Sequence, residues 1–167
     1  QIKKYMVFKD KFYRDKIIVG LVGSIGFAND PFIILDVAET LKKMGNKKIH
    51  FVFFGNGSAK KQLIKEVKIR NIKNVTIYES VIKKDALSVA KSLDVGLILH
   101  GTSRTYRYTA CPNKFFDYLY FGTHIIYNFN GPLKAELEKE NVGFYFDPKA
   151  SKALAKYLNN LDLNLLK

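Results

Sequence analysis

Lys114 and Asp117 stand three residues apart in the stretch ACPNKFFDYLYFG, residues 110–122. Pro112 suits the first turn of a helix, where its missing N–H leaves no hydrogen bond unmade, and Gly122 suits a helix end. The amino end of a helix attracts phosphate, because it carries partial positive charge and unpaired N–H groups. Lys114 would add a cation there, and Asp117 could accept hydrogen bonds from the hydroxyls of a pentose. The spacing fits a nucleoside diphosphate, and a surface Lys–Asp ion pair is the alternative.

The rest of the chain alternates between short β-rich runs and longer amphipathic stretches. We expect strands over 16–22, 48–54, 74–78, 94–99, 123–128 and 142–146. Besides the helix that follows Pro112, we expect helices over 31–45, 58–70, 83–93, 131–141 and 150–161. Strict alternation with continuous apolar strands predicts an α/β fold, a Rossmann-like doubly wound parallel sheet of about six strands with helices on both faces. The helix after Pro112 is expected to pack through four apolar residues at helical spacing: Phe115, Phe116, Leu119 and Tyr120.

Composition suits one domain with a real core, because 47% of the 167 residues are hydrophobic. We assign residues 16–167 to this domain and residues 1–15 to a lead-in segment or linker. The longest apolar runs are strand-length and too short to cross a bilayer. Cys111 is the only cysteine, which excludes an internal disulfide and favours a reducing, cytoplasmic location.

The net charge of +13 would attract polyanions such as nucleic acid, anionic lipid or phosphorylated substrates. The alternative is that the lysines are solvated surface residues, since they are scattered over nearly every expected helix. We favour a phosphate or membrane partner over nucleic acid. The stretch RTYRYT, residues 104–109, interleaves arginine with tyrosine as single-strand binders do, but it is one short segment.

Glycine-rich loops follow the first two expected strands, where ligands of open parallel sheets bind. The first loop carries Gly23, Ser24 and Gly26, and the second carries Gly55 and Gly57. Neither loop has the Gly-x-Gly-x-x-Gly pattern of dinucleotide enzymes or the Gly-x-x-x-x-Gly-Lys pattern of P-loop proteins, so both classes are disfavoured. Plain turn chemistry is the alternative for each loop.

The fourth expected strand leads into a long polar segment that carries His100, Arg104 and Arg107. The two arginines could bind phosphate, and His100 could contact a sugar. Cys111 precedes the helix start, where a thiolate is favoured, but no histidine lies nearby in sequence to activate it. We therefore read Cys111 as a small loop residue.

Several segments together resemble the C-terminal domains of glycosyltransferase family 4. CPNKFFDYLYFGTHII, residues 111–126, is similar to the family's SPNKFFDYLAAGKPVI segment. VGLVGSIG, FVFFGNGSAKKQL, NVTIYESVIKKDALSVAKSLDVGLIL and NGPLKAELEKENVGFYFDPKASKALA resemble other family units in the same order. The resemblance runs from about residue 16 to residue 160. It is strongest to transferases that add sugars to lipid-linked precursors of bacterial capsule or O-antigen.

This resemblance implies the donor-binding half of a GT-B fold, in which two Rossmann-like domains face a cleft. It implies transfer of a sugar with retention from a nucleotide sugar, a UDP- or GDP-sugar, with no metal and no cofactor. We then expect an N-terminal acceptor domain that is absent from this chain, and no transfer by the chain alone. The implied partners are the donor, that domain and a lipid-linked acceptor at an anionic membrane surface, where the protein would bind peripherally.

The same resemblance implies roles for individual residues. Lys114 would lie near the phosphates as the catalytic group, and Asp117 would hold the ribose. The backbone near Ser80 and Val81 would hold the base. The remaining donor-binding candidates are Gly23, Ser24, Gly26, Gly55, Gly57, His100, Pro112 and Asn113, with Arg104 and Arg107 as further phosphate ligands.

The sequence departs from the family pattern at three points. Thr109 stands where many members have a glutamate, and the first glycine loop lacks the Arg and Lys that grip phosphate. Asp117 replaces the usual glutamate and is one methylene shorter. Two other functions stay open: a basic nucleic-acid-binding module, and a regulatory domain that binds nucleotide sugars without catalysis.

Overall fold

The structure, a computed structural model, describes residues 13–101 and 113–162. Within these ranges, six parallel strands form one sheet. Their order across the sheet is β3 (Val75–Tyr78), β2 (Ile49–Phe54), β1 (Ile17–Val22), β4 (Val95–Ile98), β5 (His124–Tyr127) and β6 (Gly143–Tyr145). The chain builds outward in one direction from β1 and then in the other from β4. This reversal places a topological switch point between β1 and β4, where ligands of such sheets bind.

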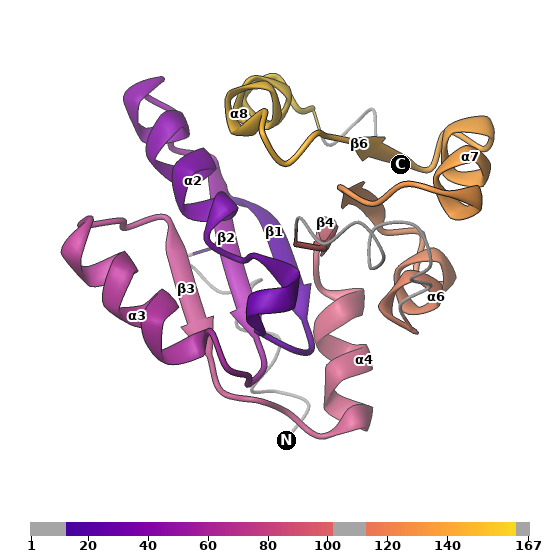
Figure 1. Cartoon of the computed structure of the whole chain (residues 1–167), viewed down its shortest axis with the longest axis horizontal. Coiled ribbons are helices and arrows are strands. Elements are labelled where there is room, and N and C mark those ends of the chain that lie inside the picture. Colours follow the sequence, from indigo (N-terminus) through magenta and orange to yellow (C-terminus); the bar gives the residue numbers. More distant parts are fainter. Residues whose placement is uncertain (1–12, 102–112, 163–167) are drawn as a thin grey trace.

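Helices cover both faces of the sheet, as the alternation of the sequence predicted (Figure 1). One face packs against α2 (Ile33–Lys43), α3 (Lys60–Ile69) and α8 (Ser151–Asn159). The other face packs against α4 (Lys83–Lys91), α6 (Asn113–Tyr120) and α7 (Pro132–Lys139). A short 3₁₀ helix, η2 (Phe27–Asn29), which the sequence did not predict, follows β1. The Rossmann-like doubly wound fold is thus confirmed.

The core divides into two layers because successive strand residues point to opposite faces. In β1, Ile17, Val19 and Leu21 pack in the layer under α2 and α8. Ile18 packs in the layer under α4, α6 and α7. Strands covered on both faces have no polar side to expose, which is why the sequence shows them as continuous apolar runs.

The face that α6 turns to the core differs from the predicted one. Phe115 and Tyr118 are buried, whereas Phe116 and Tyr120 are 57% and 84% exposed, and Leu119 is exposed as well. Gly96 of β4 explains the choice, because a Cβ there would lie only 2.6 Å from the Tyr118 ring. The missing side chain leaves room for that ring against the sheet. Of the predicted stripe, only Phe115 is correct.

The two glycine loops after β1 and β2 are joined by backbone hydrogen bonds. The Gly23 N–H donates to the Phe54 carbonyl at 2.8 Å, and the Ile25 N–H donates to the Asn56 carbonyl at 2.8 Å. A side chain on Gly55 would collide with the Gly23 carbonyl. The two loops therefore form one closely packed unit that leads directly into α3.

No helix in the described part of the chain is long and apolar enough to cross a membrane. Most of the proposed lead-in segment, residues 1–12, lies outside the described residues, as do Arg104, Arg107, Thr109, Cys111 and Pro112.

Candidate functional site

A cavity of about 340 Å³ opens at the carboxyl ends of β1, β2 and β3, beside the first turns of α6. We call it the strand-end cavity. Pockets that hold small molecules have volumes of about 300–1,000 Å³, so it is large enough for a ligand. Its described lining residues are Val22, Gly23, Phe54, Gly55, Asn56, Ser80, Val81, Ala86, Ala90, Asn113, Lys114, Asp117 and Tyr118. Seven of these were sequence candidates, drawn from four separate segments of the chain.

Helix α6 brings the only two charged side chains found among the described lining residues, Lys114 and Asp117. Asn113 and Lys114 are the first two residues of α6, so the partial positive charge of the helix end faces the cavity. Desolvation by burial lowers the pKa of Lys114 to about 8. The lowered pKa means that this ammonium has lost much of its hydration, and a bound anion would restore the lost stabilisation.

Gly23 and Lys114 are neighbours in the lining of the cavity. The Cε and Nζ atoms of Lys114 are each 3.8 Å from the position that a Cβ on Gly23 would occupy. Gly23 has a φ of +125°, a conformation that side-chain-bearing residues rarely adopt. The glycine therefore lets the cation lie over exposed backbone, an arrangement that suits a bound oxyanion.

Phe54 and the segment after β3 form the other side of the cavity. The Phe54 ring stacks on Tyr78 with a centroid distance of 4.3 Å and an interplanar angle of 12°. The Tyr78 hydroxyl in turn shares a 2.6 Å hydrogen bond with the Tyr13 hydroxyl. Ser80 and Val81 follow Tyr78 and line the cavity, so this side offers backbone and apolar surface of the kind that suits a flat base.

Tyr118 connects α6 to the strand that carries the first glycine loop. Its hydroxyl donates to the Gly20 carbonyl at 3.3 Å and accepts from the Val22 N–H at 3.4 Å. These bonds hold the end of β1 at a fixed distance from α6, because the paired register of β1 with β4 ends at Gly20. Burial raises the pKa of the Tyr118 phenol, so the hydroxyl keeps its proton.

Among the described residues of the two glycine loops, three predicted ones, Ser24, Gly26 and Gly57, do not line the strand-end cavity. The Ser24 carbonyl accepts a hydrogen bond from the Asn29 amide, and Gly26 precedes η2. Gly57 packs against the Ile25 carbonyl. The contacts that the structure gives these three residues lie within the loops themselves.

His100 is buried, and its backbone is fixed by Asn128. Its N–H donates to the Asn128 side-chain oxygen at 2.7 Å, and its carbonyl accepts from the Asn128 amide at 2.9 Å. Desolvation, and then the charge of Lys114, lower the pKa of the imidazole. His100 is thus close enough to Lys114 for an electrostatic interaction, although it does not line the cavity.

Several lining residues escaped the sequence analysis. Phe54 appeared only as the last apolar residue of a strand, and Asn56 only as the middle of a glycine motif. Ala86 and Ala90 lie four residues apart on α4, where small side chains leave space for the cavity. That small-residue spacing was visible in the sequence.

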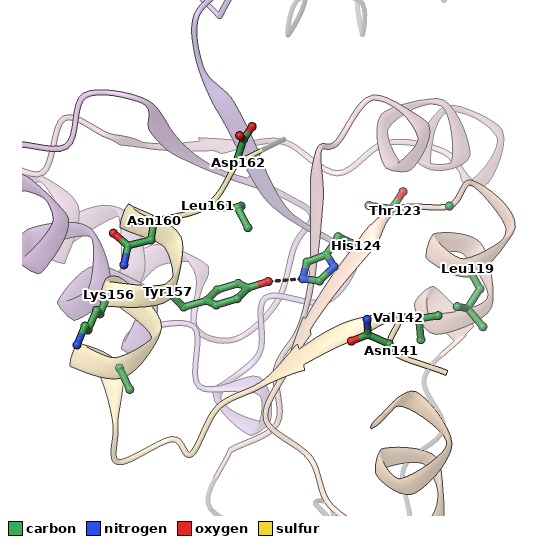
Figure 2. Close-up of a pocket in the computed structure, with 12 residues that line it drawn as sticks. Leu119, Thr123, His124, Asn141, Val142, Lys156, Tyr157, Asn160, Leu161 and Asp162 are labelled. Carbon is green, nitrogen blue, oxygen red and sulfur yellow. Dashed lines mark hydrogen bonds between the residues drawn. The ribbon is translucent and has the colours of Figure 1, made fainter. Parts of the chain in front are cut away.

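A second and larger cavity, of about 890 Å³, lies at the opposite, amino edge of the sheet. Residues near the starts of β5 and β6 and the end of α8 line it, and a 2.7 Å hydrogen bond joins His124 and Tyr157 within it (Figure 2). None of the predicted site residues that the structure describes lines it. Since nucleotide sites of such sheets lie at the carboxyl edge, the smaller cavity is the better candidate.

Among residues 13–101 and 113–162, no group of three or more His, Cys, Asp or Glu side chains could hold a metal ion. Among the described residues that line the strand-end cavity, Asp117 is the single carboxylate. Its described donor set fits an anion or a polar organic ligand better than a divalent cation.

Comparison with solved structures gives the same fold in several glycosyltransferases. HepE from Anabaena, in complex with UDP and glucose, matches with a TM-score of 0.71 at 13% identity over 95% of this chain and 41% of its own. The C-terminal domain of LpcC, a group 1 family protein from Francisella tularensis, gives 0.66 at 18% identity over 89% and 77%. The catalytic domain of cholesterol-α-glucosyltransferase from Helicobacter pylori gives 0.65 at 12% identity over 86% and 84%.

This chain therefore spans less than half the length of HepE. A comparison with curated proteins found no match. The sequence profile of the family described as "Glycosyl transferases group 1" matches residues 3–164, nearly the whole chain. By that match, and with the fold of the C-terminal GT-B domain, the chain belongs to the group 1 glycosyl transferases.

Proposed function

We propose that the strand-end cavity binds the nucleoside diphosphate part of a nucleotide sugar. The observation that carries the proposal is the position of Lys114, whose poorly hydrated ammonium lies over Gly23 at the amino end of α6. The diphosphate would contact Asn113, Lys114 and the Gly23 backbone. The ribose would reach Asp117, and the base would lie against the Ser80–Val81 segment.

In this function the chain is the donor-binding half of a retaining glycosyltransferase. The leaving diphosphate gains negative charge as its bond to the sugar breaks. Donors and cations that are already in place stabilise that charge without reorganising, which is the main electrostatic contribution to such catalysis. Lys114 would supply the cation, with no metal and no protein nucleophile.

Related proteins support a sugar nucleotide as the ligand. HepE is described in complexes with UDP and glucose, with UDP-glucose and with UDP. WaaG is described as a glycosyltransferase involved in lipopolysaccharide biosynthesis. We extend the proposal to transfer onto a lipid-linked glycan in surface polysaccharide synthesis, with the acceptor bound by a second domain upstream of this one.

Charge and exposed aromatic side chains support contact with an anionic membrane surface. The chain carries a net charge of +13, and α6 exposes Phe116 and Tyr120. A net positive charge adds attraction to anionic lipid, and aromatic side chains suit the headgroup region. Sedimentation with vesicles tests this: binding should require anionic lipid and should weaken in salt, and equal binding to neutral vesicles would contradict it.

Calorimetric titration with UDP, GDP and ADP tests the donor-binding proposal. We expect one of these nucleotides to bind with 1:1 stoichiometry and to compete with the corresponding nucleotide sugar. Salt-sensitive binding to oligonucleotides without binding of any nucleoside diphosphate would instead indicate a nucleic-acid-binding module.

A further inference from the structure

Lys60 and Glu79 form an ion pair between the start of α3 and the loop that follows β3. The Lys60 ammonium lies 2.8 Å from a Glu79 carboxylate oxygen. The Lys60 side chain is only 8% exposed, whereas that of Glu79 is 87% exposed. Glu79 directly precedes Ser80, which lines the strand-end cavity.

The loop after β3 is attached at one end by Val81, which packs against the hydrophobic layer under α4, α6 and α7. Among the described strands, β3 lies at the edge of the sheet and pairs only with β2, and the pairing ends at Phe54 and Tyr78. Outside the helices and strands of the described chain, no backbone hydrogen bond involves residues 79–81. Without backbone hydrogen bonds, the positions of Glu79 and Ser80 depend on side-chain contacts such as the ion pair.

Lys60 is attached to a much more rigid part of the site. It is the first residue of α3, which continues from the joined glycine loops. The Ala59 N–H donates to the Ile25 carbonyl at 3.0 Å, and the Lys60 N–H donates to the Gly57 carbonyl at 3.2 Å. The ion pair therefore connects the loop after β3 to the unit that carries Gly23 and Gly55.

Stability alone does not account for this pair. A cation at the amino end of a helix opposes the helix dipole. The described residues give the Lys60 ammonium no aligned hydrogen bond, so Coulomb attraction to Glu79 is what holds it. That attraction is screened by solvent, because Glu79 is almost fully exposed.

We propose that Lys60 and Glu79 are positioning residues that hold the Ser80–Val81 segment in place for the base of the bound nucleotide. This inference rests on the proposed nucleotide site and adds the device that sets its base-binding side. Because neither residue lines the strand-end cavity while Ser80 next to Glu79 does, the pair should affect recognition of the nucleoside and leave diphosphate binding intact.

The experiment compares wild type with Glu79→Gln, which removes one charge and keeps the side-chain length, and with Lys60→Met, which removes one charge and shortens the side chain by one atom. Calorimetry measures the affinities for UDP and for inorganic pyrophosphate. We expect both variants to bind UDP about fivefold more weakly, within the range that coupled positions produce. Pyrophosphate affinity should stay within about twofold of wild type. Lys60→Arg keeps the positive charge and should bind UDP with wild-type affinity.

Arg70→Met is the matched control. Arg70 pairs with Glu39 and with Asp36, the latter at 2.6 Å, and thus joins α3 to α2 away from the cavity. This variant should lower the melting temperature and leave UDP affinity unchanged. Wild-type affinity for UDP in Glu79→Gln, or an equal loss of UDP and pyrophosphate binding, would overturn the inference.

A measurement without ligand separates this inference from the proposed function. Backbone ¹⁵N relaxation of the free chain should show lower order parameters at Ser80 and Val81 in Glu79→Gln than in wild type. If the order parameters fall but wild type binds no nucleotide, the proposed nucleotide site is refuted, while the role of the Lys60–Glu79 pair in holding the loop is supported. Unchanged order parameters would refute the role of the Lys60–Glu79 pair in holding the loop.

Discussion

The ammonium of Lys114 lies over Gly23, with its nitrogen 3.8 Å from where a Cβ on that glycine would be. The two residues are far apart in sequence and belong to different elements: Gly23 to the loop after β1, and Lys114 to α6. Their proximity joins a cation, a helix amino end and bare backbone in one place. This combination is what makes the strand-end cavity a candidate for binding diphosphate.

Lys114→Met should weaken UDP binding at pH 7 by about tenfold or more, since a hydrogen bond to a charged group contributes roughly 1.5–3 kcal/mol. The same change should raise the melting temperature of the free chain by about 2–4 °C, because it removes a cation that burial disfavours. Calorimetry and thermal unfolding measure the two effects. A variant that loses stability and affinity together would indicate a structural role instead.

Wild-type affinity for UDP should fall as the pH rises through about 8. Burial places the pKa of Lys114 there, so the ammonium is charged below that pH and becomes neutral above it. The gain from the cation is therefore complete at pH 7 and mostly lost by about pH 9. Titrations from pH 6.5 to 9.5 test this, and Lys114→Met should show a flat profile across the same range.

Asp117→Ala should weaken UDP binding about tenfold while leaving pyrophosphate affinity unchanged, because the carboxylate is assigned to the ribose hydroxyls. Asp117 is only partly buried, so the variant should fold normally. Circular dichroism checks the fold, and calorimetry measures both ligands. Equal UDP affinities in the two proteins would refute the ribose role.

Gly23→Ala should cost about 1 kcal/mol of stability or more, because its φ is +125°. It should also weaken UDP binding, since the new methyl group would lie against Lys114. Gly45→Ala is the matched control, with a φ of +74° and no atom within 4 Å of the new Cβ. Urea unfolding should show a loss for both variants, and only Gly23→Ala should lose affinity.

Much of the fold could be predicted from the sequence because its signals are local and repeated. Each of the six strands begins and ends within one residue of the predicted bounds, and the helices α2, α3, α4, α7 and α8 within two. Apolar runs of strand length between amphipathic stretches leave few other arrangements. Glycines at the loop positions marked the ends of the strands.

The orientation of α6 could not be predicted in the same way. Five of its eight residues are aromatic or leucine, so several faces have an apolar stripe. The choice of Tyr118 depends on the space above Gly96, which lies in β4, more than twenty residues earlier in the chain. A tertiary contact of this kind has no local signal.

The candidate site shows the same division. Lys114, Asp117 and Gly23 were identified from motifs, because helix ends and glycine turns leave local patterns. The Lys60–Glu79 pair and the stack of Phe54 on Tyr78 join separate elements. They depend on how β3 pairs with β2, which the sequence alone does not specify. His100 was expected to contact a sugar; it does not line the strand-end cavity, and the hydrogen bonds of its backbone to Asn128 join residues far apart in sequence.

The most direct test of the nucleotide site is a crystal structure of this chain soaked with UDP. The account predicts diphosphate density against Asn113, Lys114 and the Gly23 backbone, with the ribose at Asp117. Density in the His124–Tyr157 cavity at the opposite edge of the sheet, with the strand-end cavity left empty, would contradict it.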